Sequence, residues 1–142
     1  MAFKVFVDTD VIIDFLIDRQ PHAASSSKIF DFCEKRLLTV CTSALCINNV
    51  HYIIRKVVGE KNARRVIDEL LDLIEVLDVS KDDLRNALKS YFKDFEDAIQ
   101  HAVAIKENGL KSIITRNTKD YKKSKISVFT PDIFIKVMEN EQ

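Results

Sequence analysis

The side chains of this 142-residue chain that are best suited to chemistry are carboxylates, which gather in three short stretches. They are Asp8, Asp10 and Asp14 in the first stretch, Asp94 and Asp97 in the second, and Asp120 in the third. Clustered carboxylates repel one another, so without a counter-charge some of them are held protonated at a raised pKa. A hard divalent cation removes this penalty, because Mg²⁺ prefers oxygen ligands and keeps several of its waters. Such an ion can activate a water molecule and offset charge on a phosphate.

The elements that must position these carboxylates are strands alternating with helices. Short apolar runs predict strands at 3–7, 37–41, 74–79, 112–115 and 126–129. Helices are predicted over 10–16, 25–35, 44–58, 62–73, 81–88 and 94–107, and a last one from residue 131. This alternation predicts right-handed crossovers and an α/β fold, with a parallel sheet covered on both faces.

The carboxyl ends of strands are where open α/β sheets bind ligands. Asp8 directly follows the first strand, and Asp94 and Asp97 share one face at the start of a helix. We therefore expect Asp8 and Asp97 to converge and hold a metal ion, with Asp94 beside them. Asp14 is expected to support the site rather than to bind metal.

Simpler roles compete with this interpretation. Asp8 could serve simply as the cap of the helix that follows it, and Asp97 could pair with His101 one turn away. Asp120 lies among lysines and could form a surface ion pair instead of joining a site. Glu96 is expected to point elsewhere on its helix, toward solvent.

Composition limits the class of protein more than its activity. The chain can bury a core, because 46% of its residues are hydrophobic. Lys+Arg and Asp+Glu both total 22, and this neutral net charge argues neither for nor against binding of nucleic acid. Cys33, Cys41 and Cys46 lack C-x-x-C spacing and are expected to be buried thiols in a reducing compartment. No apolar run approaches a membrane span and no signal peptide is seen, so we expect a cytoplasmic location and no membrane partner.

Four motifs together resemble the PIN-domain family. In order they are D-T-D-V-I-I-D-F-L after a hydrophobic strand, D-F-E-D-A-I-Q-H-A-V-A, I-I-T-R-N-T-K-D-Y and V-F-T-P-D-I-F. The resemblance covers nearly the whole chain and implies one domain over 1–142. The implied fold is a three-layer α/β/α sandwich around a mostly parallel sheet of four to five strands. It also implies Mg²⁺- or Mn²⁺-dependent ribonuclease activity, and many small stand-alone members are toxins of the VapC type that pair with an antitoxin.

The resemblance assigns roles to individual residues. Asp8 matches the first acid of the family and Asp97 the third, while Asn49 (or, less well, Asn48) falls where the second acid is expected. The fourth motif of the family usually reads Thr-x-Asp, and here Asn117 takes the place of the aspartate, so Asp120 is the candidate to supply that charge. The implied catalytic residues are Asp8, Asp94, Asp97 and Asp120, of which Asp8, Asp94 and Asp97 bind metal; Asp10, Asp14, Asn49, Thr115 and Asn117 support them. An amide oxygen lacks the negative charge that holds a hard cation, so we expect weaker metal affinity than in a four-acid site.

Basic residues follow the fourth predicted strand and suit an RNA path. They are led by Arg116, Lys119 and Lys122, although such a run is also typical of a solvated face. The amphipathic stretches 44–58 and 62–73 are a candidate surface for a homodimer or an antitoxin, and core packing explains the same stripe.

Two other functions remain open from the sequence. The segment 7–11, V-D-T-D-V, also fits the opening of haloacid-dehalogenase-like phosphatases, with Asp8 as nucleophile and Asp10 as acid/base. A non-catalytic module that keeps a degenerate site for RNA or for a partner protein is the third hypothesis.

Overall fold

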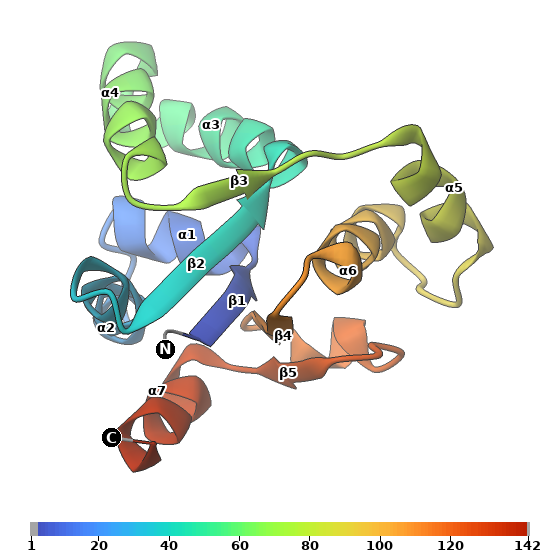
Figure 1. Ribbon diagram of the computed structural model, residues 1–142. Coiled ribbons are helices and arrows are strands. Elements are labelled where there is room, and N and C mark those ends of the chain that lie inside the picture. The colour runs from blue at the N-terminus through green and yellow to red at the C-terminus, as the bar shows by residue number, and fades with distance from the viewer. Residues whose placement is uncertain (1–2, 142) are drawn as a thin grey trace.

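The computed structural model describes residues 3–141, whose strands form one five-stranded sheet with the order β3-β2-β1-β4-β5 (Figure 1). The strands are β1 (Phe3–Val7), β2 (Leu38–Ser43), β3 (Glu75–Leu77), β4 (Leu110–Ile114) and β5 (Ser127–Phe129). Every neighbouring pair is parallel. The prediction of a parallel sheet of four to five strands is therefore confirmed.

Seven α-helices and one 3₁₀ helix connect the strands within the described residues. They are α1 (Thr9–Leu16), α2 (Ala23–Glu34), α3 (Ala44–Val58), α4 (Glu60–Leu71), α5 (Lys81–Lys89), α6 (Phe95–Lys106), the 3₁₀ helix η1 (Thr118–Tyr121) and α7 (Pro131–Asn140). The short helix η1 was not predicted, since its four residues carry no apolar period. The helix predicted from residue 62 begins earlier, directly after Gly59, whose φ of 87° lets the chain turn from α3 into α4.

The two faces of the sheet pack two separate apolar clusters. Val5 and Val7 of β1 belong to the cluster beneath α1, α2 and α7, whereas Phe6 belongs to the cluster beneath α6. Successive side chains of a strand point to opposite faces, so both faces of β1 are buried. Helices thus cover both sides of the sheet (Figure 1), which is the predicted α/β/α arrangement.

The register of β1 against β4 brings distant residues to one edge of the sheet. Val7 lies opposite Ile114, and the backbone N–H of Asp8 donates to the carbonyl oxygen of Ile114 at 3.0 Å. Asp8 and Thr115 therefore leave their strands side by side, at the carboxyl edge.

Ser43 ties two helices to the same edge. Its hydroxyl oxygen accepts from the backbone N–H of Cys46 at 3.0 Å, so it caps α3. The same hydroxyl donates to the side-chain oxygen of Gln100 on α6 at 2.5 Å, and both residues are buried. The start of α3 is thereby fixed relative to α6.

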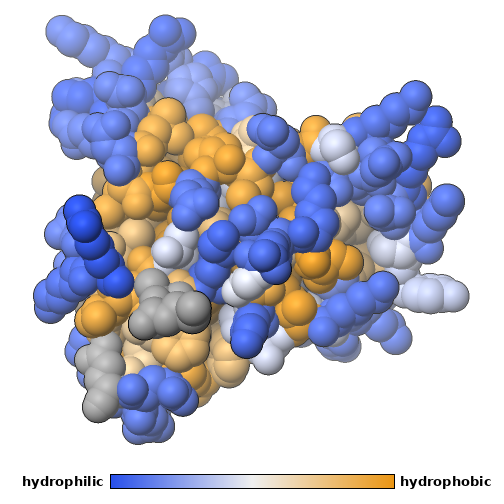
Figure 2. All heavy atoms as spheres, viewed as in Figure 1, coloured by the Kyte–Doolittle hydropathy of each residue, from blue (hydrophilic) through white to orange (hydrophobic). Residues whose placement is uncertain are grey.

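The surface carries some exposed apolar residues. In the view of Figure 2, apolar side chains show between the polar surfaces of α2 and α4, where edge strand β3 lies; Leu71 of α4 and Val76 of β3 are partly exposed. Cys33, Cys41 and Cys46 are buried free thiols, as expected. No helix between residues 3 and 141 combines the length and apolar character needed to span a membrane.

Candidate functional site

Asp8 is buried at the carboxyl end of β1 and is held by three hydrogen bonds. One carboxylate oxygen, Oδ1, accepts from the backbone N–H of Thr9 at 2.8 Å, so Asp8 does cap α1. The other oxygen, Oδ2, accepts from the hydroxyl of Thr115 at 3.0 Å and from the phenolic hydroxyl of Tyr121 at 3.2 Å. The capping role and a position in the site are thus combined in one residue.

Asp97 meets Asp8 at the same phenolic hydroxyl. Asp94 is the N-cap of α6, and its carboxylate accepts from the backbone N–H of Asp97 at 2.9 Å. The side chain of Asp97 then reaches the hydroxyl of Tyr121, with 3.4 Å between that oxygen and Oδ1. Asp8 and Asp97, which are far apart in sequence, therefore converge on Tyr121.

The two carboxyl groups are electrostatically strained. Burial, with a smaller contribution from Asp10, raises the pKa of Asp8 to about 6. Burial and the charges of Asp8 and Asp94 raise the pKa of Asp97 to about 7, with weaker contributions from other acids. Among the ion pairs within residues 3–141, none joins a lysine or arginine to either residue. Neither carboxylate is thus neutralised by a direct ion pair within the described residues.

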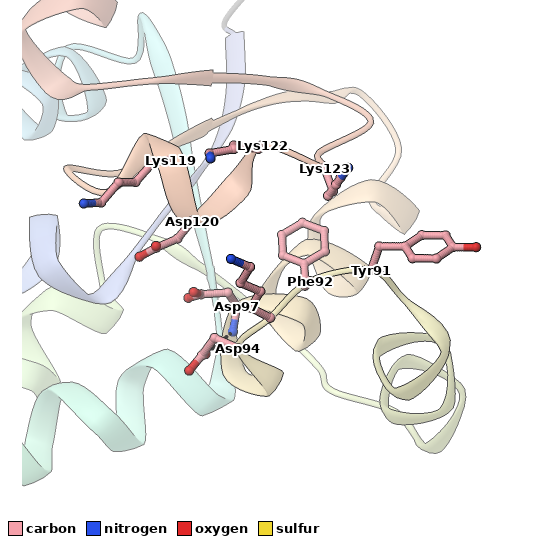
Figure 3. A pocket seen from close by; sticks show the side chains of 9 residues that line it. Tyr91, Phe92, Asp94, Asp97, Lys119, Asp120, Lys122 and Lys123 are labelled. Carbon is pink, nitrogen blue, oxygen red and sulfur yellow. Dashed lines mark hydrogen bonds between the residues drawn. The ribbon is translucent and has the colours of Figure 1, made fainter.

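Asp94, Asp97 and Asp120 line one hollow of about 310 Å³. Figure 3 shows their carboxylates gathered at one side, with Phe92 and Tyr91 at the other side and Lys119, Lys122 and Lys123 above. Asp120 comes from η1, and its charge contributes to the raised pKa of Asp97. The hollow therefore combines an acidic end with a basic rim.

Asp10 and Asp14 position the loop after β4 and do not face the hollow. Asp14 is fully buried and pairs with the guanidinium groups of Arg19 and Arg116, each at 2.7 Å. Asp10 accepts from the backbone N–H of Arg116 at 3.0 Å and from the amide of Asn117 at 3.4 Å. Arg116 was predicted to lie on an RNA path with Lys119 and Lys122; its partly exposed guanidinium pairs with buried Asp14, whereas the two lysines are exposed.

Glu96 is exposed to solvent, as expected, but it also contacts a residue assigned to the site. Its carboxylate accepts a hydrogen bond from the side-chain amide of Asn49 on α3. Burial and the charge of Asp94 raise its pKa. A carboxylate from α6 therefore lies beside Asn49, the position where the PIN-domain resemblance expects an acid.

Sequence reasoning missed Tyr121 altogether. This residue is buried, and burial and the charges of Asp8 and Asp97 raise its pKa, so its hydroxyl keeps its proton and donates it. The only local signal was an aromatic residue beside Asp120 in an otherwise polar stretch.

His101 does not pair with Asp97, contrary to one of the simpler interpretations. Its Nε2 accepts from the backbone N–H of Lys125 at 3.0 Å, and its ring packs on Phe92 at a centroid distance of 4.7 Å. His101 therefore supports the wall of the hollow.

The donor set fits a partly hydrated divalent ion. Between residues 3 and 141, no three His, Cys, Asp or Glu side chains stand close enough together to cage an ion directly. Asp8 and Asp97 nevertheless present hard oxygen atoms that have raised pKa values and no cationic partner. Because Mg²⁺ binds through one or two carboxylates and retains waters, this arrangement suits it better than a complete protein cage would.

Comparisons with known proteins agree with this geometry. A family model described as a PIN domain matches residues 4–119. Ribonuclease VapC1 of Aquifex aeolicus is 30% identical over 136 residues, which is 92% of each chain. A toxin-antitoxin complex from Klebsiella pneumoniae superposes with a TM-score of 0.67 at 24% identity, covering 89% of this chain and 97% of that one. VapC20 of Mycobacterium tuberculosis, described as a Sarcin-Ricin loop cleaving toxin, gives 0.61 at 19% identity, covering 77% and 86%. With its sheet, its convergent acids and these matches, the chain belongs to the PIN-domain family.

Proposed function

We propose that this protein is a metal-dependent endoribonuclease. The observation that carries the proposal is the convergence of Asp8 and Asp97 on Tyr121, at the carboxyl edge of the sheet, with no lysine or arginine paired to either carboxylate within residues 3–141. The name of the relative from Aquifex aeolicus, a ribonuclease, supports the substrate class.

The side chains divide into those that hold the ion and those that orient them. Asp8 and Asp97, assisted by Asp94, would hold Mg²⁺ or Mn²⁺. When bound, such an ion supplies a water of lowered pKa and offsets negative charge on a phosphodiester. Thr115 and Tyr121 donate to the same oxygen of Asp8 and so fix its orientation. Asp120 faces the hollow from η1 and adds negative charge on the side open to substrate.

Two alternatives are weighed against this function. Membership of the PIN-domain family removes the haloacid-dehalogenase-like phosphatase. A binding module without activity stays the second candidate, because Asn49 and Asn117 stand where acids are expected. The contact between Asn49 and Glu96 favours the ribonuclease over the binding module, because it places a carboxylate beside the position where the second acid is expected.

We also propose that this chain binds a partner protein, an antitoxin. Several of the similar solved structures are toxin-antitoxin complexes, which supports an antitoxin for this chain. The outer side of α3 exposes Tyr52, Ile53 and Val57, and Val57 is 64% exposed. Exposed apolar side chains that lie close together mark protein interaction sites, so we propose this side of α3 as the antitoxin surface.

Asp8→Asn and Asp97→Asn should each reduce RNA cleavage at least about a hundredfold. The reason is that metal-ion catalysis contributes several kcal/mol to stabilising the transition state. The measurement is cleavage of a labelled single-stranded RNA with Mg²⁺ or Mn²⁺, with circular dichroism to show that the variants are folded. Asp68→Asn, an exposed change on α4, is the control. Cleavage at the parent rate in either site variant would refute the assignment.

Metal binding should stabilise the fold at pH 8 but not at pH 5. An acid whose pKa is higher in the folded state binds more protons there, so stability falls as pH rises from about 4 toward 7, by on the order of 3 kcal/mol for Asp8. Mg²⁺ binds the deprotonated carboxylates and restores this loss at pH 8, whereas at pH 5 protons compete with it. Urea unfolding with and without Mg²⁺ measures the effect.

Asp97→Asn is the matched variant for this measurement. It should flatten the pH dependence of the unfolding free energy and abolish most of the stabilisation by Mg²⁺. An equal effect of Mg²⁺ at both pH values, or an unchanged effect in the variant, contradicts the metal assignment.

Glu96→Gln should slow cleavage about tenfold, because it removes one negative charge from the edge of the site. In the double variant Asn49→Glu with Glu96→Gln, the carboxylate moves to the helix where the family usually carries it, and the rate should recover. Single-turnover cleavage rates provide the test, with Glu69→Gln on α4 as an exposed control. A double variant as slow as Glu96→Gln would contradict the proposal that Glu96 supplies the negative charge expected at position 49.

Val57→Glu should prevent binding of the antitoxin proposed above. A buried, unpaired charge at an interface is costly, whereas Val57 is exposed in the free chain, so its fold should be unaffected. Co-purification of the two proteins is the readout, with Leu88→Glu on α5 as the control. Light scattering of the chain alone distinguishes a homodimer on the same surface. An intact complex with Val57→Glu would move the antitoxin surface elsewhere.

A further inference from the structure

The acidic hollow continues into a second one. The two share Tyr91, Phe92 and Lys123 in their walls, so they lie next to each other. The second hollow has a volume of about 410 Å³ and extends toward the end of α5 and the face of α6 that carries His101. A ligand that occupies the acidic hollow can therefore extend past Tyr91 into the second one.

The two hollows differ in their acidic side chains. The first is lined by Asp94, Asp97 and Asp120 together with four lysines, whereas the described residues that line the second include Lys89, Lys123 and Lys125 and no carboxylate. A cleft lined by one sign of charge concentrates ligands of the opposite sign. A polyanion is thus attracted to the second hollow, where no carboxylate among the described lining residues opposes it.

Tyr91 lines both hollows and lies on a short segment that its neighbours Ser90 and Phe92 anchor to the protein. Its side chain is 87% exposed. The hydroxyl of Ser90 donates to the carbonyl of Ala87 at 2.8 Å and accepts from the backbone N–H of Phe92 at 3.4 Å. Phe92 packs on His101 and, edge to face, on Tyr121 at a centroid distance of 5.8 Å. Figure 3 shows the consequence: Phe92 faces the lysines at the hollow, while the ring of Tyr91 projects outward.

An exposed aromatic ring on a fixed segment, flanked by lysines, is the arrangement with which proteins bind single-stranded nucleic acid. The base stacks on the ring and the phosphates contact the cations. Stacking tolerates any base, since every base has a π-face. Core packing does not explain Tyr91, because most of its surface is in solvent.

We propose that Tyr91 stacks on an unpaired base of the RNA strand that flanks the scissile phosphate, and that Lys123 and Lys125 bind phosphates of the same flank. This inference rests on the proposed function and deepens it by giving the substrate a path. The backbone of Lys125 is anchored at this wall because its N–H donates to His101 at 3.0 Å. The substrate class is then single-stranded RNA, or an unpaired loop, bound with little sequence preference at this position.

Binding of a labelled, unstructured ten-nucleotide RNA in EDTA tests the proposal, with its affinity measured by fluorescence anisotropy. Tyr91→Ala should weaken binding about tenfold, whereas Tyr91→Phe keeps the stacking surface and should stay within about twofold. Replacing Lys123 and Lys125 together by Gln should reduce the slope of log affinity against log salt by about 1.4, the value for two lost phosphate contacts to a single strand. Lys61→Gln on α4 is the matched control and should change neither quantity.

The outcomes separate this inference from the function it rests on. Equal binding by Tyr91→Ala and the parent, while the parent still cleaves RNA with Mg²⁺, overturns the stacking role alone. Loss of affinity for the proposed antitoxin but not for RNA in Tyr91→Ala makes this a protein site and also overturns the stacking role. A parent chain that neither binds nor cleaves RNA overturns the function itself. RNA binding that falls in Tyr91→Ala supports the stacking role, even where cleavage is not detected.

Discussion

Two carboxylates held against one neutral phenol, without a basic partner in residues 3–141, are the feature on which the rest of this site depends. Asp8 and Asp97 would repel each other at neutral pH, and burial adds to the cost by raising the pKa of both. Such strain persists only where the surrounding structure imposes it. Here the parallel pairing of β1 with β4, and the docking of α6 beside them, keep the two groups together.

Asp14, near the same edge of the sheet, is by contrast neutralised by ion pairs. Asp14 is more deeply buried than Asp97, yet it pairs with both Arg19 and Arg116, and through Arg116 it anchors the loop that carries Thr115. Removal of a partner from such a buried pair is strongly destabilising. One aspartate is therefore used for structure, with arginines supplied, whereas Asp8 and Asp97 have no ion-pair partner among the described residues. That contrast between acids at one edge of the sheet supports the interpretation of Asp8 and Asp97 as functional.

Sequence reasoning predicted the fold and the meeting of Asp8 and Asp97 at one edge of the sheet, because both follow from local pattern. A β-branched run that ends in Asp8 must place that residue at a strand end, and parallel strands bring such ends to one edge. The roles of Tyr121 and Glu96 could not be predicted, because they depend on where η1 and α3 dock against α6. The same is true of His101, whose partner is a backbone N–H distant in sequence. The resemblance to PIN domains identified Asn49 as a departure, but only the packing of the helices shows that Glu96 lies beside it.

The central claim is that Asp8 and Asp97 together hold a divalent cation. Crystals soaked in Mn²⁺ and measured at the manganese absorption edge test it most directly. The account predicts an anomalous peak between the carboxylates of Asp8 and Asp97, with waters completing the coordination. No peak at that position, or a peak bound only by acids elsewhere on the surface, would contradict it.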